Sequence, residues 1–165
     1  MAYCVIRTDL VSGTKQPADL VSLRFYNAEG EKAEVENGVI VHLQGYEEGE
    51  REVRKAVAAT AGADLNECAI IAAPEVMYDE RLKNLEDFIN EKGKAIRGYI
   101  PRSRNTFSFT KEGFVNGVVP AVDSEVGIGA NGKIDAAGTG LGKCVHIEQV
   151  GRYTYYAIEI SKTEA

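Results

Sequence analysis

The sequence contains few of the residues on which most catalytic and metal sites depend. It has two histidines, His42 and His146, and both lie inside apolar runs with the character of strands. A Ser/His/Asp triad could use only one of these two side chains. No H-E-x-x-H, C-x-x-C or G-x-S-x-G motif is present. We therefore expect a protein that is not an enzyme and that uses no cofactor and no metal.

Cysteine is also scarce, and its spacing argues against disulfide bonds. Cys4, Cys68 and Cys144 are far apart in the sequence. Cys4 and Cys144 lie in apolar, strand-like runs, where a thiol behaves as a small hydrophobic side chain. We expect all three cysteines to be reduced and structural.

An excess of positive charge and long apolar stretches are both absent. The chain carries 19 lysines and arginines against 25 aspartates and glutamates, which gives a net charge of -6. General nucleic-acid binding depends on a basic surface, so this balance argues against it. No apolar run approaches the roughly 20 residues of a membrane-spanning helix, and the N-terminus lacks the pattern of a signal peptide. We expect folding in a cytoplasm, with no nucleic acid and no membrane among the partners.

The C-terminal part of the sequence, from residue 114 to residue 160, alternates short apolar runs with turn dipeptides. This rhythm is typical of a small antiparallel sheet or barrel. Asn131-Gly132 predicts a type I′ hairpin turn at 130–133, because both residues tolerate a positive φ. Gly151-Arg152 predicts a type II′ turn between two further strands.

The stretch from Gly127 to Gly132 matches the G-x-G-x-x-G pattern of dinucleotide-binding sites. Such a site needs the glycine loop to open a helix after the first strand of a βαβ unit. No helical pattern follows here, and the next glycine-rich stretch, 138–142, lacks the Lys-Ser/Thr ending of a phosphate loop. We interpret the first stretch as a glycine-rich hairpin and the second as a loop.

The first half of the sequence contains further strand-like runs. Apolar residues favour strands at 20–26, 39–43 and 68–73. The ambiguous stretch 52–59 is also interpreted as a strand, because of its β context. Residues 3–8 predict a short strand in an N-terminal arm, and an arm of this kind often docks on the sheet edge of a neighbouring molecule.

One amphipathic helix is predicted at about 79–92. Its apolar stripe consists of residues at helical spacing, namely Tyr78, Leu82, Leu85, Phe88 and Ile89. Asp79 fits the N-cap position and Gly93 fits the C-terminal cap. If this stripe is core, Leu85→Ala should cost about 2 to 5 kcal/mol of stability. The predicted fold class is mainly β (α+β): an antiparallel β-sheet or small β-barrel with this one helix packed across it.

The 165 residues suffice for one domain or for two small lobes that share a core. We expect an N-terminal arm, β region and helix at 1–96. A glycine-rich, β-barrel-like region is expected at 97–165. The two regions are also compatible with one continuous domain.

The segment from residue 92 to residue 104 carries five positive charges and no negative ones. In an acidic protein it is the best candidate for a contact with an acidic partner or with phosphates. The alternative, to which we give greater weight, is a helix end and loop whose cations balance the helix dipole and the acidic loops of the chain itself. The candidate partner-binding residues are Lys92, Lys94, Arg97, Arg102 and Arg104.

Five stretches of the sequence carry a resemblance to known proteins. They are Tyr3–Thr14, Ala73–Arg81 with the following helix, Val150–Tyr156, Val126–Ile134 and Gly140–Val145. The first three resemble head structural proteins of tailed bacteriophages, of the capsid decoration (cement) type. The last two look like the small glycine-rich β-barrel of cement proteins. Compact cement proteins are often little more than that barrel, so the N-terminal β region and the helix depart from the pattern.

The resemblance implies a non-enzymatic virion protein that binds the outside of the capsid lattice and stabilises it. Its partner would be the major capsid protein, with self-association on the lattice. The protein would be made in the host cytoplasm and would reside in the virion.

Three other functions stay open. A tail-tube or head-to-tail joining protein also builds rings from a β-sheet with one helix, and oligomers formed without capsid shells would favour it. A cellular ligand-binding β-barrel should contain a closed apolar pocket in a monomer. A hydrolase comes last, because it would need a carboxylate pair across a deep cleft.

Overall fold

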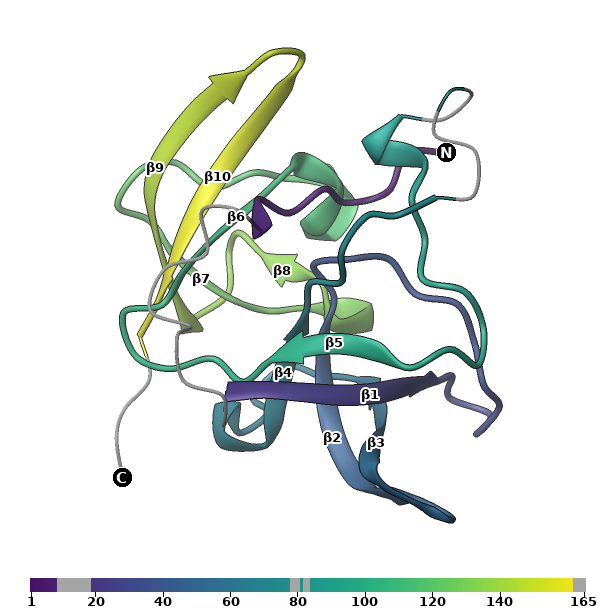
Figure 1. Cartoon of the computed structure of the whole chain (residues 1–165). Helices are drawn as coiled ribbons and strands as arrows, with labels where there is room; N and C mark the ends of the chain where they lie inside the picture. Colours follow the sequence, from purple (N-terminus) through teal and green to yellow (C-terminus); the bar gives the residue numbers. More distant parts are fainter. Residues whose placement is uncertain (9–18, 78–80, 82–83, 162–165) are drawn as a thin grey trace.

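In the described part of the chain, ten strands form a closed barrel and an open sheet (Figure 1). The structure is a computed structural model that describes residues 1–8, 19–77, 81 and 84–161. Around the barrel the order is β1 (Leu20–Tyr26), β3 (Glu50–Ala58), β2 (Ile40–Glu47), β4 (Cys68–Ile71) and β5 (Ile96–Tyr99). From edge to edge of the sheet the order is β6 (Thr106–Phe109), β10 (Tyr153–Ile160), β9 (Gly140–Val150), β7 (Glu125–Ile128) and β8 (Ile134–Asp135). The mainly β fold class predicted from the sequence is confirmed.

The barrel closes through one parallel strand pair, β1 with β3, and four antiparallel pairs. Apolar side chains from all five strands fill its interior, namely Leu23, Val41, Leu43, Ala56, Ala69, Ile71 and Ile96. Gly98 has no room even for a Cβ atom, which would lie 2.9 Å from Cδ2 of Leu23. The closed barrel therefore lies in the first half of the chain, and not at 97–165 where the sequence predicted it. The division at 96/97 also cuts through β5.

A second apolar cluster joins the barrel to the sheet. Successive side chains of a strand point to opposite sides, so Ala69 and Ile71 of β4 enter the barrel while Cys68 and Ile70 face the sheet. The sheet contributes large buried side chains to this shared core, including Phe107, Phe109, Phe114, Leu141 and Ile158. One hydrophobic cluster therefore contains residues of both β-structures, which share this core.

The N-terminal arm lies on the sheet of its own molecule. Ile6 forms a β-bridge with Phe109, and the Thr110 N–H donates to the carbonyl of Val5 at 3.2 Å. The Arg7 N–H donates to the backbone of β6, also at 3.2 Å. Residues 5–7 therefore pair with the edge of β6 in the same chain. Residues 9–18 lie outside the described residues.

The helix predicted at about 79–92 is wrong for the residues that the structure describes there. Residues 84–92 contain only the single 3₁₀ turn η4 (Leu85–Asp87), and Leu85 is 40% exposed. The backbone of Asn90 exchanges hydrogen bonds with Val35 at 2.9 and 3.1 Å, which holds the segment in an extended form. Residues 78–80 and 82–83 lie outside the described residues. The other short 3₁₀ turns are η3 (Leu65–Glu67), η5 (Lys111–Gly113), η6 (Val115–Gly117) and η7 (Ala130–Gly132).

Both hairpins predicted from turn dipeptides are present. Asn131 and Gly132 have φ values of 57° and 70°, as a type I′ turn requires, between β7 and β8. Gly151, with φ of 60°, begins the two-residue connection between β9 and β10. The glycine-rich stretch at 127–132 is therefore a hairpin, as predicted.

Gly132 also determines how closely the sheet approaches the barrel. A Cβ atom at this position would lie 2.2 Å from the carbonyl oxygen of Ile40 in β2. The turn between β7 and β8 thus packs directly on the barrel backbone.

We expect Gly132→Ala to destabilise the protein more than Gly151→Ala. Both residues have positive φ, so each substitution carries about 1 to 2 kcal/mol of backbone strain. An added Cβ at Gly132 would also clash with neighbouring atoms, whereas a Cβ at Gly151 meets nothing within 4 Å. Urea unfolding should show a loss at Gly132 at least about twice that at Gly151. Equal losses would contradict a close contact between the turn and β2.

The shared core makes a second prediction about stability. Ile70 is fully buried between barrel and sheet, so Ile70→Ala should lower the free energy of unfolding by about 2 to 5 kcal/mol. Leu85→Ala is the control, and it should change the value by less than about 0.5 kcal/mol, because the side chain is exposed. Urea titrations of both variants measure the two changes in the free energy of unfolding. If Leu85→Ala cost more than Ile70→Ala, Leu85 would be a core residue, as the predicted helix required.

Candidate functional site

The five basic residues predicted as a partner-binding site are spread over three segments. Lys92 and Lys94 lie in the loop before β5, and Arg97 lies on β5. Arg102 and Arg104 lie in the loop between β5 and β6. All five residues are exposed. Two of them, Lys94 and Arg97, line a common groove.

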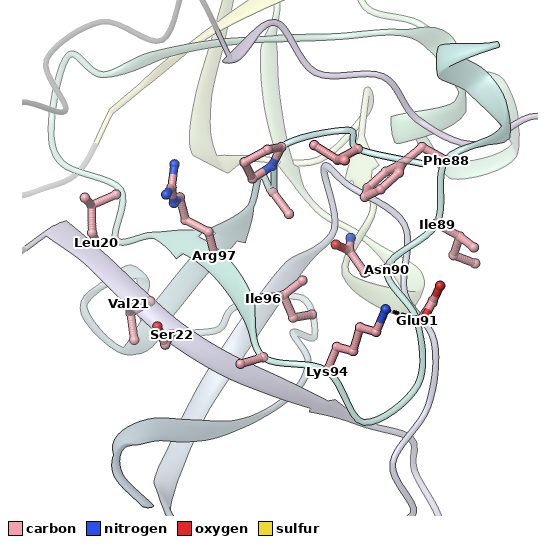
Figure 2. A pocket seen from close by; sticks show the side chains of 14 residues that line it. Leu20, Val21, Ser22, Phe88, Ile89, Asn90, Glu91, Lys94, Ile96 and Arg97 are labelled. Atoms are coloured by element: carbon pink, nitrogen blue, oxygen red, sulfur yellow. Dashed lines mark ion pairs between the residues drawn. The ribbon is translucent and has the colours of Figure 1, made fainter. Parts of the chain in front are cut away.

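This groove, which we call the basic groove, has an apolar floor and a charged rim (Figure 2). Its cavity volume is about 620 Å³. Ile96 and Phe88 are buried beneath it, while Leu20 and Val76 are 44% and 74% exposed beside it. Phe88 belonged to the stripe of the predicted helix, and in the extended segment it lines this groove instead.

The two cations of the basic groove differ in their partners. Lys94 Nζ lies 2.5 Å from Glu91 Oε2, and both side chains are exposed. An exposed pair of this kind contributes little to stability, so the lysine can exchange its partner at small cost. The Arg97 side chain makes no ion pair or hydrogen bond within the described residues. Figure 2 shows Arg97 beside Leu20, away from the ion pair.

Arg102 is committed to the fold. Its Nε lies 2.5 Å from Oδ1 of Asp19, a residue that is 1% exposed. The Arg102 side chain is 52% exposed, but removing it would leave the buried Asp19 carboxylate without its ionic partner, which is destabilising. The backbone of Asp19 also accepts a hydrogen bond from Ile100 at 2.8 Å, so this contact anchors the start of β1. Arg102 therefore balances an acidic residue of its own chain, which is the role that the second interpretation of the basic segment gave to its cations.

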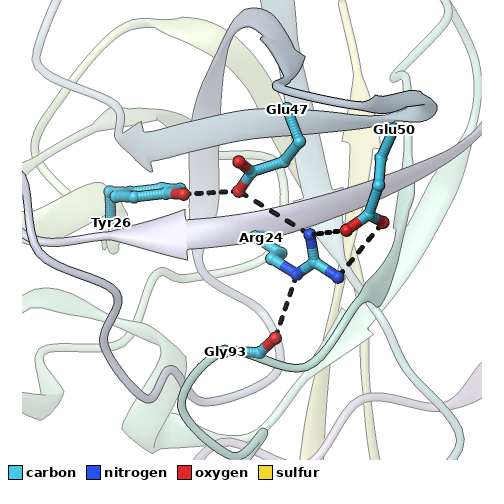
Figure 3. A network of polar contacts seen from close by, with 5 residues as sticks. All are labelled: Arg24, Tyr26, Glu47, Glu50 and Gly93. Carbon is cyan, nitrogen blue, oxygen red and sulfur yellow. Dashed lines mark hydrogen bonds and ion pairs between the residues drawn. The ribbon is translucent and has the colours of Figure 1, made fainter.

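A polar network holds the loop before β5 in place (Figure 3). Arg24 of β1 donates two hydrogen bonds to Glu50, at 2.7 and 3.2 Å, and one from Nε to the carbonyl of Gly93 at 3.0 Å. The hydroxyl of Tyr26 donates to Glu47, whose Oε1 lies 3.9 Å from Arg24 Nη1. The network therefore holds both the loop before β5 and the tip of the β2–β3 hairpin against β1.

A second hollow, of about 870 Å³, lies between the barrel, the N-terminal arm and the turn between β7 and β8. Its walls include Phe25 and Val57 from the barrel. Glu36 spans its polar side, with Oε1 2.8 Å from Lys133 Nζ and Oε2 accepting from the Cys4 N–H at 2.7 Å. No signal in the sequence predicted this hollow, because its lining comes from residues between 1 and 133.

The histidines and cysteines have structural surroundings. His42 Nε2 lies 3.0 Å from Glu67 Oε2 at the barrel rim. Cys4, Cys68 and Cys144 are buried thiols outside any disulfide, as predicted. Burial raises the pKa of Cys4 to about 12, which keeps its thiol protonated. Among the described residues, no group of three or more His, Cys, Asp and Glu could hold a metal ion, and no helix has the length and apolarity to cross a bilayer.

Comparisons with known proteins found no match. The chain matches no protein-family model, no curated protein sequence and no solved structure. Its function must therefore be inferred from its own residues and geometry.

The ion pair between Arg24 and Glu50 predicts a pH-dependent contribution to stability. The hydrogen bond from Arg24 lowers the pKa of Glu50 below its ordinary value. A carboxyl group with a lowered folded-state pKa contributes stability above its unfolded pKa of about 4.3, and this is lost as the pH falls through the folded value. We expect Glu50→Gln to lower the melting temperature at neutral pH, by an amount that shrinks below about pH 4.

The matched control is Glu48→Gln, at an exposed position on the same hairpin. It should have little effect at any pH, because surface substitutions away from such networks change stability by less than about 0.5 kcal/mol. A Glu50→Gln deficit that stays constant through the acid range would show that the lost contribution is not ionic.

Proposed function

We propose that this protein is a non-enzymatic structural protein of a tailed-phage virion that binds the outside of the capsid and stabilises it. The observation that carries the proposal is the basic groove, where an apolar floor lies beside Lys94 and beside Arg97, whose side chain has no ionic partner among the described residues. Apolar contacts supply affinity to such a groove, and the cations orient an acidic partner segment. The sequence resemblance supplies the class of partner, which is the major capsid protein.

The shared core supports the same function. It fixes the barrel and the sheet relative to each other, so a contact at the basic groove also positions the rest of the molecule. A preorganised surface loses less conformational entropy on binding. On a lattice the same weak contact is repeated, and linked contacts hold more strongly than their separate affinities indicate.

The packed interior of the barrel disfavours the ligand-binding alternative. A ligand-binding barrel needs an apolar cavity, whereas here side chains such as Leu23 and Ile71 fill the space and Gly98 cannot accept even a Cβ atom.

Sedimentation with empty phage heads that lack the protein tests the proposal. The wild-type protein should co-sediment with the heads in a saturable way and should raise the temperature at which they rupture. Rings or tubes formed by the purified protein alone would favour the tail-tube or joining function instead. A protein that stays free in the supernatant at all head concentrations would overturn the proposal.

Neutralising the basic groove should weaken capsid binding. Two exposed ion pairs at up to about 1 kcal/mol each correspond to a loss of affinity of up to about thirtyfold for Lys94→Gln/Arg97→Gln. The loss should be largest at low salt, where such contacts are least screened. Arg102 is left unchanged, because Asp19 depends on it.

The control variant is Lys111→Gln/Lys143→Gln, which removes the same charge from exposed positions elsewhere. It should bind like the wild type. If the two double variants bind equally well at low salt, the basic groove is not the contact, even where the wild-type protein binds the capsid.

A further inference from the structure

Asn90 is a polar residue within the apolar floor of the basic groove. It lines the groove and is only 5% exposed, so its amide belongs to the floor and not to the rim. Figure 2 shows its side chain between Phe88 and Ile96. The polar atoms of a buried amide are normally all hydrogen-bonded. The partners of Asn90 therefore show whether any of its atoms is open to a ligand.

Two carbonyl oxygens fix the orientation of the Asn90 amide. Its Nδ2 donates to the backbone carbonyl of Val35 at 3.0 Å and to Oδ1 of Asn37, also at 3.0 Å. A backbone carbonyl can only accept, so Nδ2 must face Val35. The Ala73 N–H donates to the same atom of Asn37 at 3.1 Å, which identifies that atom as the amide oxygen. Turning the Asn90 amide round would therefore lose both bonds.

These two bonds use both N–H groups of the Asn90 amide and leave its oxygen. Oδ1 of Asn90 accepts no hydrogen bond from the described residues. The backbone of Asn90 also exchanges hydrogen bonds with Val35, so the residue is held from both its backbone and its side chain. The groove thus contains a preorganised hydrogen-bond acceptor that the fold itself does not use.

Three features of the groove determine which ligand chemistry fits it. The acceptor on Asn90 requires a donor, Arg97 requires an anion, and the apolar floor requires an apolar group. An ionised fatty acid has no donor, because a carboxylate only accepts. An acidic peptide segment offers all three groups. Each of its residues except proline has a backbone N–H, and its side chains can be apolar or can carry a carboxylate.

The donor also indicates the conformation of such a segment. In a helix only the first four backbone N–H groups lack a partner within the helix. An extended segment makes no hydrogen bonds within itself, so its N–H groups are open along its whole length. The fixed acceptor on Asn90 therefore favours an extended segment over a helix.

We propose that Asn90 recognises a backbone N–H of an extended acidic segment bound in the basic groove. Oδ1 of Asn90 accepts that N–H, Arg97 pairs with one carboxylate of the segment, and apolar side chains of the segment contact the floor. Arg97 takes the carboxylate because Lys94 is already paired with Glu91. The inference rests on the proposed function, since it describes the capsid segment that the groove would hold.

Titration of the purified protein with a synthetic peptide, followed by NMR, tests the inference. The probe is acetyl-Leu-Asp-Val-Leu-amide, and we expect a Kd of about 1 mM, because a short flexible segment loses conformational entropy on binding. The backbone signals of residues 88–91 and 94–97, which line the groove, should move. The Cγ signal of Asn90 should move with them, as Oδ1 accepts a hydrogen bond.

Matched peptides separate the hydrogen bond from the ion pair. Amide-to-ester replacement removes one backbone N–H at a time with little change in shape. At one position it should weaken binding by about threefold to tenfold and abolish the Cγ shift of Asn90, and at the other positions it should do neither. Asparagine in place of the peptide's aspartate should weaken binding by about threefold to fivefold. The Arg97→Gln variant should bind both of these peptides equally.

Asn90 itself stays unchanged in this experiment, because its N–H groups hold its own segment to Val35. Ester peptides that all bind like the parent would overturn the inference. So would an Asn90 Cγ signal that does not move, or a probe that does not bind up to its solubility limit.

The same titration is independent of the experiment with phage heads. Heads that bind the protein while the peptide does not would retain the capsid function and refute recognition by Asn90. Peptide binding as predicted, without co-sedimentation, would support the recognition and refute the capsid as the source of the segment.

Discussion

The structure depends on two barrel strands that are buried on both faces. In β4 and in the first part of β2, one set of side chains fills the barrel and the alternate set packs against the sheet. Ile71 and Val41 face inward, whereas Ile70 and Ile40 join the aromatic residues of the sheet. Each strand must therefore be apolar at nearly every position, and a shift of one residue would exchange the two cores. This constraint gives the barrel and the sheet a shared core.

The surfaces left over by this arrangement are those that can bind partners. The arm closes the edge of β6, and the turn at Gly132 seals the sheet against the barrel. Among the described residues, the basic groove beside β5 stays open, with the exposed Lys94 and Arg97 beside its apolar floor. The proposed contact with an acidic and partly apolar segment would use this groove.

Local sequence signals predicted the parts of the fold that depend on local chemistry. Asn131-Gly132 fixes its own turn, because few other residue pairs accept two positive φ values. The near-continuous apolar run at 39–43 indicated a strand covered on both faces, and its four apolar side chains are buried in β2 and just before it, while His42 is partly exposed. Strands were likewise predicted at 20–26 and 68–73, and the structure has them at Leu20–Tyr26 and Cys68–Ile71.

What the sequence did not predict depends on contacts between distant residues. The stripe that favoured a helix at 79–92 has helical spacing, but the backbone of Asn90 pairs with Val35 and holds its segment extended. Barrel closure needs the parallel pairing of β1 with β3, for which no short motif exists. The five basic residues lie within 13 positions of the sequence, yet Arg102 turns to the buried Asp19, whereas Lys94 and Arg97 share a groove.

Scanning calorimetry of the purified protein tests most directly the claim that barrel and sheet share one core. If β2 and β4 serve both, neither part can unfold alone, and the protein should show one transition. The calorimetric and van't Hoff enthalpies should then agree, with a ratio of about 1. Two transitions, or a calorimetric enthalpy about twice the van't Hoff value, would mean that the barrel and the sheet fold as separate units and would contradict the account.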